Sequence, residues 1–454
     1  MSDYISKVSV EGTEYDIADS KARQDIAGLV TDIDDLEAAS DETKKMVASP
    51  NYALLGKNLK DSFADADALW AALAQEDYSK IRLGDYWPVT LNGTFRDYGM
   101  MTCQTGQAYY SDTELTTQAG TAAQDLAATP VLDNALLGSH KPYCEVTVSG
   151  TKYYCAYDDC LPYQEKTLNN ALLKFEAMPN VYWRYGDSGA QNFHNGHPHI
   201  LFSPRDGLPT TLKMRKTNET WEDQHVETFT GDGSNRAFVL EGNVGTLGYV
   251  FVSGEKKTYS THYTWDANTK TITFVTAQTP VAGAVVQVEY MDSFTPWGGT
   301  ALYKTFNDPE HGILRLIQQA DPQLYSHIYK GSNGKGMRYY AETRSKTGQQ
   351  GGGWQDRGIL FLPMEDEIWG RPIHSASGLN AYTQMQQWPI YQLGGRRHFA
   401  KGAGNAASRN NVWCASSTSV ANFANVYYYG YPHNNNASSA NVAAPCFIFC
   451  EANG

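Results

Sequence analysis

Long apolar runs and clusters of basic residues are both missing from this 454-residue chain. No apolar run reaches the roughly 20 residues of a transmembrane helix, and the polar start "MSDYISKVSVEG" lacks the features of a signal peptide. The formal net charge is −13 and no Lys/Arg cluster offsets it, which argues against nucleic-acid binding. We therefore expect no nucleic-acid partner, no membrane insertion, and a chain that stays in its cell or leaves by lysis or in a particle.

Cysteine pairs at the spacing of a zinc-ligand motif are also missing. The seven cysteines are Cys103, Cys144, Cys155, Cys160, Cys414, Cys446 and Cys450. No CxxC pair occurs, so the sequence predicts no structural zinc site. Cys144 and Cys155 flank a predicted hairpin, "CEVTVSGTKYYC", and could face each other. Because there is no export signal, we expect mostly buried, free thiols.

Tyrosine, in contrast, is abundant, with 30 copies against 16 phenylalanines. A tyrosine offers a large contact area and a hydrogen-bonding tip at low entropic cost, so the excess favours an extensive contact surface. The alternative is a β-rich protein with many half-buried strands, where tyrosine is also favoured. Composition alone leaves both interpretations open.

The N-terminal 50 residues predict a hairpin followed by a helix. Residues 4–16 alternate apolar and polar around a glycine turn. Ile26, Leu29, Ile33 and Leu36 then follow the 3-4-3 spacing of a coiled-coil seam. A lone helix of this size is marginal, so we expect self-association, with packing on its own domain as the alternative.

From residue 80 the chain is rich in predicted strands and loops. "KIRLGDYWPVTLNGTFRDYGMM" predicts two strands around an Asn92-Gly93 turn, and "LNNALLKFEAM" (168–178) predicts a helix. Further on, residues 311–331 predict a helix. The stretch 357–370 predicts an apolar strand running into a Glu-rich turn, and "CFIFC" predicts a closing strand.

Residues 226–291 form a separable unit, with predicted strands every eight to twelve residues and Gly, Asn or Pro at the turns. This is the spacing of a small antiparallel β-sandwich. Its "FTGDGS" start and "TITF" strand resemble the small β-modules of phage tail fibres. The resemblance implies a spacer or a carbohydrate-binding platform.

Two groups of residues are weak candidates for chemistry. His194, His197 and His199 lie close enough in sequence to hold a transition metal, but their spacing and Pro198 favour loop histidines. Glu365, Asp366 and Glu367 are carboxylates such as glycoside hydrolysis requires, but adjacent residues point in different directions and no second acidic cluster is evident. We therefore expect no enzyme, no metal and no cofactor.

The C-terminal region offers a different kind of site. Residues 410–450 contain no Lys, Arg, Asp or Glu. Uncharged loops rich in Asn, Ser and Tyr have the chemistry of an antibody paratope, and an exposed aromatic patch marks a contact site. The alternative is that these are ordinary strand and turn residues. We expect Asn434–Asn436 to form a loop, and "NFANV" and "APCFIF" to form framework strands. The predicted ligand-binding residues are Asn405, Ser408, Asn410, Ser416, Ser417, Ser419, Asn422, Asn425, Tyr427, Tyr428, Tyr429, Tyr431, His433, Asn434, Asn435 and Asn436.

A family resemblance rests on the order of five motifs. "KIRLGDYWPVTLNG", "ILFLPMEDEIWG", "WPIYQLGGRRHFAKG", "VWCASSTSVANFANV" and "ASSANVAAPCFIF" follow each other as in the C-type-lectin-like ligand-binding domains at the tips of phage tail proteins. The chain departs from that pattern at Trp413-Cys414-Ala415, where the family has "WLR", and at "VAAPC", where it has "GVRPA". The calcium-binding triplets of animal C-type lectins do not occur. The start "SKVSVEGTEYDIADSKAR" resembles tail-fibre attachment segments.

The resemblance implies an α+β, β-rich fold: a C-type-lectin-like domain with an inserted small antiparallel β-sandwich and a short N-terminal hairpin plus coiled-coil helix. The expected domains are an attachment hairpin and trimerising helix (1–50), the first part of the lectin-like domain (80–225), an Ig-like insertion (226–292) and the C-terminal lectin-like domain (293–454). The mixture of Asn, Tyr, Ser and His at 405–441 also resembles the variable cassette of a diversity-generating retroelement.

The expected function is that of a virion receptor-binding tail protein, assembled in the bacterial cytoplasm. Its partners would be a bacterial surface receptor, protein or glycan, other tail or baseplate proteins, and two further copies in a homotrimer. The alternatives are a surface-polysaccharide depolymerase and a purely structural baseplate or fibre component.

Overall fold

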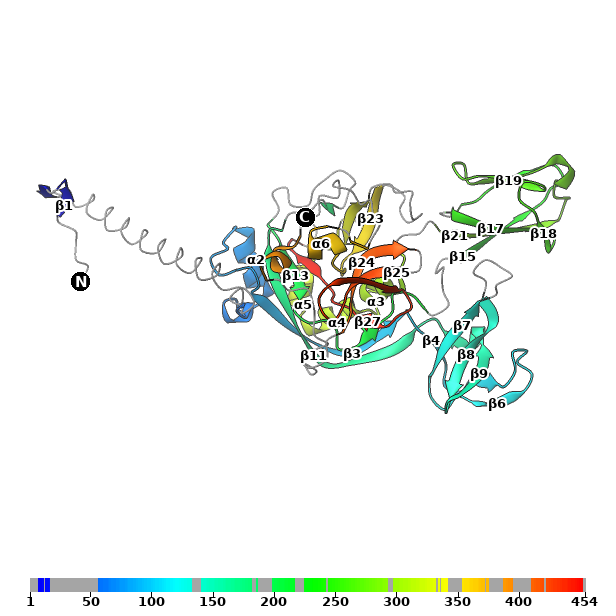
Figure 1. Ribbon diagram of the computed structural model, residues 1–454, viewed down its shortest axis with the longest axis horizontal. Coiled ribbons are helices and arrows are strands. Elements are labelled where there is room, and N and C mark those ends of the chain that lie inside the picture. The colour runs from blue at the N-terminus through cyan, green and yellow to red at the C-terminus, as the bar shows by residue number, and fades with distance from the viewer. Residues whose placement is uncertain are drawn as a thin grey trace.

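A computed structural model describes the chain in segments (Figure 1). The described residues are 7–11, 13–16, 56–132, 140–181, 185–186, 198–216, 224–241, 244–292, 297–331, 334, 336–341, 353–371, 373–374, 387–394, 410–419 and 422–451. The predicted N-terminal hairpin is confirmed, because β1 (Lys7–Val10) pairs antiparallel with β2 (Thr13–Asp16). The predicted coiled-coil helix, on which the homotrimer prediction depends, lies outside the described residues.

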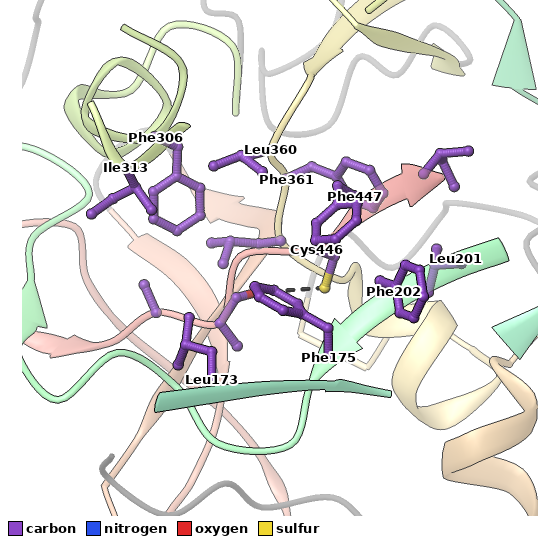
Figure 2. Close-up of a cluster of buried hydrophobic side chains, with 14 of the residues drawn as sticks. Leu173, Phe175, Leu201, Phe202, Phe306, Ile313, Leu360, Phe361, Cys446 and Phe447 are labelled. Carbon is purple, nitrogen blue, oxygen red and sulfur yellow. Dashed lines mark hydrogen bonds between the residues drawn. The ribbon is translucent and has the colours of Figure 1, made fainter. Parts of the chain in front are cut away.

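The central body is built on one antiparallel sheet of four strands in the order β28-β13-β11-β3. The strands are β3 (Tyr86–Asp97), β11 (Gln164–Pro179), β13 (Ile200–Pro204) and β28 (Phe447–Phe449). Figure 2 shows Phe175, Phe202 and Phe447 packed together in the core that the sheet supports, and the Phe447 ring centroid lies 4.9 Å from that of Phe175. The last strand of the chain thus closes a sheet begun near residue 86.

Two sequence predictions about this sheet are wrong. β3 runs unbroken through Asn92 and Gly93, because both halves of the strand pair with β11. The irregularity lies on the partner strand, where the register shifts between Leu168 and Ala171 opposite Asn92. The predicted helix at 168–178 is part of β11 itself. Its Leu, Ala and Glu residues favour a helix, but pairing on both edges overrides that weak local preference.

The described part of the body includes the helical elements η1 (Leu59–Asp61), α2 (Ala66–Ala74), α3 (Ala301–Asn307), α4 (Ile313–Ala320) and α5 (Pro322–Ser326). The predicted helix at 311–331 is confirmed in part, since Pro322 divides it into α4 and α5. Asp321 occupies the junction, where Oδ1 accepts from Leu324 N and Oδ2 accepts from Trp87 Nε1 at 2.8 Å. This carboxylate therefore caps α5 and ties it to β3.

Two smaller sheets complete the body. One has the order β14-β27-β24-β25-β26, and the other has the order β12-β22-β23. The first contains β14 (Thr211–Leu212), β24 (Val412–Ser419), β25 (Asn422–Val426), β26 (Pro432–Asn436) and β27 (Asn441–Val442). The second contains β12 (Tyr185–Gly186), β22 (Met337–Ala341) and β23 (Gly353–Gly358). The short helices α6 (Glu365–Trp369) and α7 (Pro389–Gly394) lie between β23 and β24 in sequence.

A seven-stranded module occupies residues 101–161, between β3 and β11, and Figure 1 shows it as a separate lobe. Its strands are β4 (Met101–Cys103), β5 (Ala108–Tyr110), β6 (Gln118–Thr121), β7 (Leu126–Leu132), β8 (His140–Val148), β9 (Thr151–Ala156) and β10 (Cys160–Leu161), with the 3-10 turn η2 (Tyr157–Asp159). The predicted hairpin between Cys144 and Cys155 is confirmed as β8–β9. Sequence reasoning did not recognise the rest as a separate unit.

A second module spans residues 224–292 and has two sheets around its own core. Its strands are β15 (Gln224–Thr230), β16 (Ala237–Val239), β17 (Val244–Val252), β18 (Glu255–Lys257), β19 (Tyr263–Asp266), β20 (Thr271–Phe274) and β21 (Val285–Asp292), with the 3-10 turn η3 (Thr276–Gln278). Because β15 and β21 pair antiparallel, the module begins and ends at the same place.

The predicted class, β-rich α+β, is confirmed by these several antiparallel sheets with few helices. Within the described segments, no helix combines the length and apolar character needed to cross a membrane.

Candidate ligand-binding surface

The β25–β26 hairpin carries the centre of the charge-free C-terminal region. Its strands pair from Asn422 opposite Asn436 to Val426 opposite Pro432. The connection is closed by two backbone hydrogen bonds, Tyr427 N to Tyr431 O at 2.9 Å and Gly430 N to Tyr427 O at 2.6 Å. Gly430 has a φ of 89°, a conformation that glycine adopts without strain. The turn therefore projects three successive tyrosines beyond the end of the sheet.

These side chains gather into one aromatic group, which we call the tyrosine cluster: Tyr427, Tyr428, Tyr429, Tyr431 and His433. The ring centroid of Tyr427 lies 4.1 Å from Tyr428, 4.7 Å from Tyr431 and 5.0 Å from His433. Tyr428 lies 4.2 Å from Tyr429. Tyr429 is 65% exposed and Tyr431 is 47% exposed. Rings that pack on each other and still face solvent form a pre-organised contact patch.

The chemistry of the tyrosine cluster is that of neutral hydrogen bonding and stacking. A hydrogen bond with Tyr428 raises the pKa of the exposed Tyr429 hydroxyl above its usual value. The Tyr429 phenol therefore stays protonated at neutral pH, so it can both donate and accept. Flat apolar rings with hydroxyl tips suit a ligand that combines apolar faces with hydroxyl or amide groups.

The strands behind the tyrosine cluster hold it in place. Phe423, Ala424 and Val426 of β25 are buried, which confirms "NFANV" as framework. The side chain of Asn411 accepts a hydrogen bond from Tyr428 N at 3.0 Å. Trp413 in β24 is fully buried and donates its Nε1–H to Leu212 O at 2.9 Å. The tyrosines are thus displayed from a rigid base, which lowers the entropy lost when a ligand binds.

The asparagine run does not form the predicted loop. Asn434, Asn435 and Asn436 belong to β26, the edge strand that pairs with β25. Pairing on a single edge is enough to hold a segment that has poor strand propensity. Asn435 Nδ2 donates to Asn441 Oδ1 at 3.3 Å, while Asn436 Oδ1 accepts from Ser438 N and Ser438 Oγ. Asn434 and Asn435 are half-buried and Asn436 is exposed.

Three predicted contact residues lie inside the protein. The prediction that they contact ligand is wrong, because they belong to the framework. Ser416, Ser417 and Asn425 are 9%, 4% and 0% exposed. Ser416 Oγ accepts from Glu365 N at 2.9 Å and so joins β24 to α6. Asn425 lies in β25 between Trp413 of β24 and His433 of β26. A side chain in a central strand faces either the core or the surface, and residue type alone did not reveal which.

The structure describes only some of the remaining residues that were predicted to bind ligand or metal. Asn410 and Asn422 are half-buried. Ser419 ends β24. Asn405 and Ser408 lie outside the described residues, as do His194 and His197.

His374 is a member of this surface that sequence reasoning missed. Its ring centroid lies 6.5 Å from that of His433, and its Nε2 lies 3.3 Å from Pro432 O. Glu365 Oε1 accepts from His374 N at 2.8 Å, which fixes the exposed histidine beside β26. The two histidines are far apart in sequence, so no spacing rule relates them.

The three adjacent carboxylates form the first turn of α6, not the predicted Glu-rich turn. Glu367 is fully buried and accepts two hydrogen bonds from Arg357, at 2.8 Å and 2.6 Å, as well as one from Met364 N. Burial, reinforced by the charge of Glu367, raises the pKa of Asp366 to about 8. These contacts assign α6 to the framework behind the surface.

His199, the described member of the histidine trio, is buried, and its Nε2 lies 3.1 Å from Val181 O. It therefore participates in the fold rather than facing solvent.

We compared the whole chain with protein-family models, curated proteins and solved structures, and none of the three comparisons found a match.

Proposed function

We propose that this chain is a phage tail receptor-binding protein that recognises a bacterial cell-surface ligand through the tyrosine cluster. The observation that carries the proposal is the group of closely packed tyrosines at the β25–β26 turn, with Tyr429 and Tyr431 exposed, in a stretch of 41 residues (410–450) without a charged side chain. Exposed aromatic patches of this kind mark contact sites.

The order of the sequence motifs supports a C-type-lectin-like domain as the platform. In the described residues, the motif "ILFLPMEDEIWG" contains α6 and "VWCASSTSVANFANV" contains β24 and β25. "ASSANVAAPCFIF" contains β27 and closes the central sheet through β28. Buried strands that support a displayed turn are the arrangement that such a domain requires to present variable residues.

Affinity would come chiefly from Tyr429 and Tyr431, the most exposed members of the tyrosine cluster. Aromatic anchors supply most of the binding energy in many interfaces, and neighbouring amides and hydroxyls set the specificity. His374, beside His433, and Asn434, the residue after His433 in β26, offer such polar groups. Assembly as a homotrimer on a tail would convert weak single contacts into firm attachment.

The decisive test uses the double variant Tyr429→Ala, Tyr431→Ala in the full chain. Labelled protein is first applied to a panel of bacterial strains to find cells that it binds. We expect the double variant to bind such cells at least about tenfold more weakly, since each truncated anchor removes roughly 1–2 kcal/mol. Surface truncation leaves the fold intact, which circular dichroism and thermal unfolding would verify.

The matched control is Tyr259→Ala, because Tyr259 is 59% exposed in the 224–292 module, away from the tyrosine cluster. It should bind cells as the unmodified chain does. Equal binding by the double variant would refute recognition through the tyrosine cluster. A chain that bound no strain would point instead to a structural baseplate or fibre component.

Two further experiments address the remaining expectations. Release of sugar fragments from the surface polysaccharide of a bound strain would identify a depolymerase instead. For the proposed retroelement cassette, sequencing the surrounding genome would test for a reverse transcriptase and a near-identical template repeat. The buried Ser416, Ser417 and Asn425 should then be spared, while codons of the exposed turn should vary.

A further inference from the structure

Four of the seven cysteines belong to the module at 101–161, far in sequence from the tyrosine cluster. Cys103 of β4 lies directly opposite Cys160 of β10. Cys144 of β8 lies directly opposite Cys155 of β9. Opposite residues of an antiparallel pair project from the same face, so each pair points its two thiols the same way.

The two pairs meet in the interior of the module. In the sheet order β10-β4-β7-β8-β9-β5-β6, β4 and β9 are three strand spacings apart, which is about 14 Å in a flat sheet. Yet the Sγ atoms of Cys103, Cys155 and Cys160 all lie within 4.8 Å of one another. Cys155 Sγ and Cys160 Sγ are separated by 3.3 Å. The sheet therefore curls over and closes on these thiols.

Cys144 is in position to be the fourth member of the group. It is fully buried, faces the same side as Cys155, and its thiol interacts with that of Cys160. Cys103 and Cys155 are also fully buried, and Cys160 is half-buried. One thiol thus stands near the surface and three are enclosed.

Tyr109, Leu126, Tyr153 and Tyr157, all partly buried, pack against a small core in the module. The buried members of that core among the described residues are Met101, Cys103, Ala122, Ala128, Cys144, Val146 and Cys155. Three of these seven residues are the cysteines themselves, and two are alanines. A domain of about 60 residues with so small an apolar core normally depends on a metal or on covalent cross-links.

We propose that Cys103, Cys144, Cys155 and Cys160 bind one structural zinc ion. Zinc takes four thiolates at about 2.3 Å in tetrahedral geometry, which places neighbouring sulfurs about 3.8 Å apart, close to the separations among Cys103, Cys155 and Cys160. Cys155 and Cys160 are separated by four residues, within the two-to-four spacing of zinc-ligand pairs. A search for CxxC alone overlooks this signal.

Two disulfides, Cys103–Cys160 and Cys144–Cys155, are the competing arrangement, because the strand register allows both. The sulfur positions favour the metal. Cys155 Sγ lies against both Cys160 and Cys103, which belong to the other pair, so the thiols form one shared group rather than two separate couples. Soft thiolates arranged around one point are the donor set that zinc prefers.

The test is metal analysis of the full chain, expressed with zinc in the medium and purified without chelator. We expect about one zinc per chain by elemental mass spectrometry. The cobalt-substituted chain should show the absorption bands of a tetrahedral thiolate complex. Cys160→Ser should lose most of the bound metal, and because Cys160 is the half-buried ligand, this variant disturbs the core least.

Cys414→Ala is the matched control, since Cys414 is a buried cysteine of the central body. It should retain one zinc. A chain that binds no zinc or cobalt with its thiols reduced would overturn the proposal. So would an intact mass showing two hydrogens lost for each of two disulfides. These readouts on the unmodified chain decide the question even if a variant fails to fold.

Discussion

At the scale of single residues, burial distinguishes the tyrosines that can contact a ligand from the carboxylates of α6 that belong to the framework. Tyr429 and Tyr431 hold their rings in solvent, where they are free to bind. Glu367, fully buried, is neutralised by two hydrogen bonds from Arg357. A buried ion pair is costly to break, because removing one partner leaves an uncompensated charge. Burial raises the pKa of Glu367 and also that of the adjacent Asp366.

Asp366 should make the stability of the protein depend on pH. Its pKa rises from 3.8 to about 8 on folding, so between these values the folded chain holds a proton that the unfolded chain releases. The free energy of unfolding should therefore fall as pH increases from about 4 to 8, by up to roughly 1.4 kcal/mol per pH unit. In Asp366→Asn this slope should flatten, leaving the variant more stable than the parent at pH 8. Urea unfolding at several pH values measures this.

Asp112→Asn serves as the control for that experiment. Backbone hydrogen bonds, led by that from Thr116 N, lower the pKa of Asp112 to about 2. Its contribution to stability is present above the unfolded pKa and lost as pH falls toward 2, so it is constant between pH 5 and 8. The control should keep the parent's slope over that interval. An equal slope in Asp366→Asn and its parent would contradict the assignment.

At the scale of elements, the turn of the β25–β26 hairpin brings the uncharged side chains of the tyrosine cluster together into one contact surface. Gly430 permits the turn because its φ of 89° is the left-handed conformation that other residues adopt only with strain. Tyr428 and Tyr429 lie just before it, so their direction depends on this backbone geometry. The same element also contains β26, whose asparagines are ordered only by their pairing with β25.

Gly430→Ala should weaken ligand binding more than it weakens the fold. A side chain at this φ costs about 1–2 kcal/mol, and the turn would relieve this strain by rotating the tyrosines away from their present contacts with one another. We expect a loss of cell binding with the central body still folded. Fluorescence binding to a recognised strain, together with thermal unfolding, would measure both.

Gly150→Ala is the matched control, because Gly150 has a φ of 81° in the β8–β9 turn and an added Cβ would meet nothing within 4 Å. It imposes the same backbone strain away from the tyrosine cluster. Its cell binding should equal that of the parent. Equal loss of binding in both variants would mean that the turn geometry is not what presents the tyrosines.

At the scale of the whole molecule, one body is assembled from separated segments while two modules interrupt it. The main core combines residues from 59–95, 168–214, 297–391 and 412–450. The modules at 101–161 and 224–292 have cores of their own. For each module, the two points where the chain leaves and re-enters the body are neighbours. Asp97 pairs with Gln164 beside the first module, and Gln224 pairs with Met291 at the ends of the second. Insertions with adjacent ends disturb a host fold little.

Replacing residues 101–161 with a short Gly/Ser linker should leave the central body folded. The Tyr98 and Tyr163 rings, 5.9 Å apart between centroids, mark the points to be joined. We expect cell binding and the thermal unfolding of the body to be retained, with zinc content lost. As a comparison, Phe175→Ala in the main core should cost about 3–5 kcal/mol. An unfolded deletion variant would show that the module is required by the body.

Local pattern was sufficient for several features. The N-terminal hairpin, the β8–β9 hairpin, the helical structure within 311–331 and the framework role of "NFANV" all follow from alternation, helical spacing or turn residues close in sequence. The neutral aromatic chemistry of the C-terminal surface likewise follows from composition, because side-chain type does not depend on the fold.

Long-range pairing decided the rest. β11 is a strand because β3 and β13 flank it, although its residues favour a helix. Asn425 is buried and His374 joins His433 because β24, β25 and α6 come together only in the folded chain. The thiols of Cys103, Cys155 and Cys160 meet only because the sheet of the 101–161 module closes on itself. The sequence by itself determined the chemistry of these groups, and the tertiary structure decided which groups meet, because contacts between distant segments depend on how the sheets close.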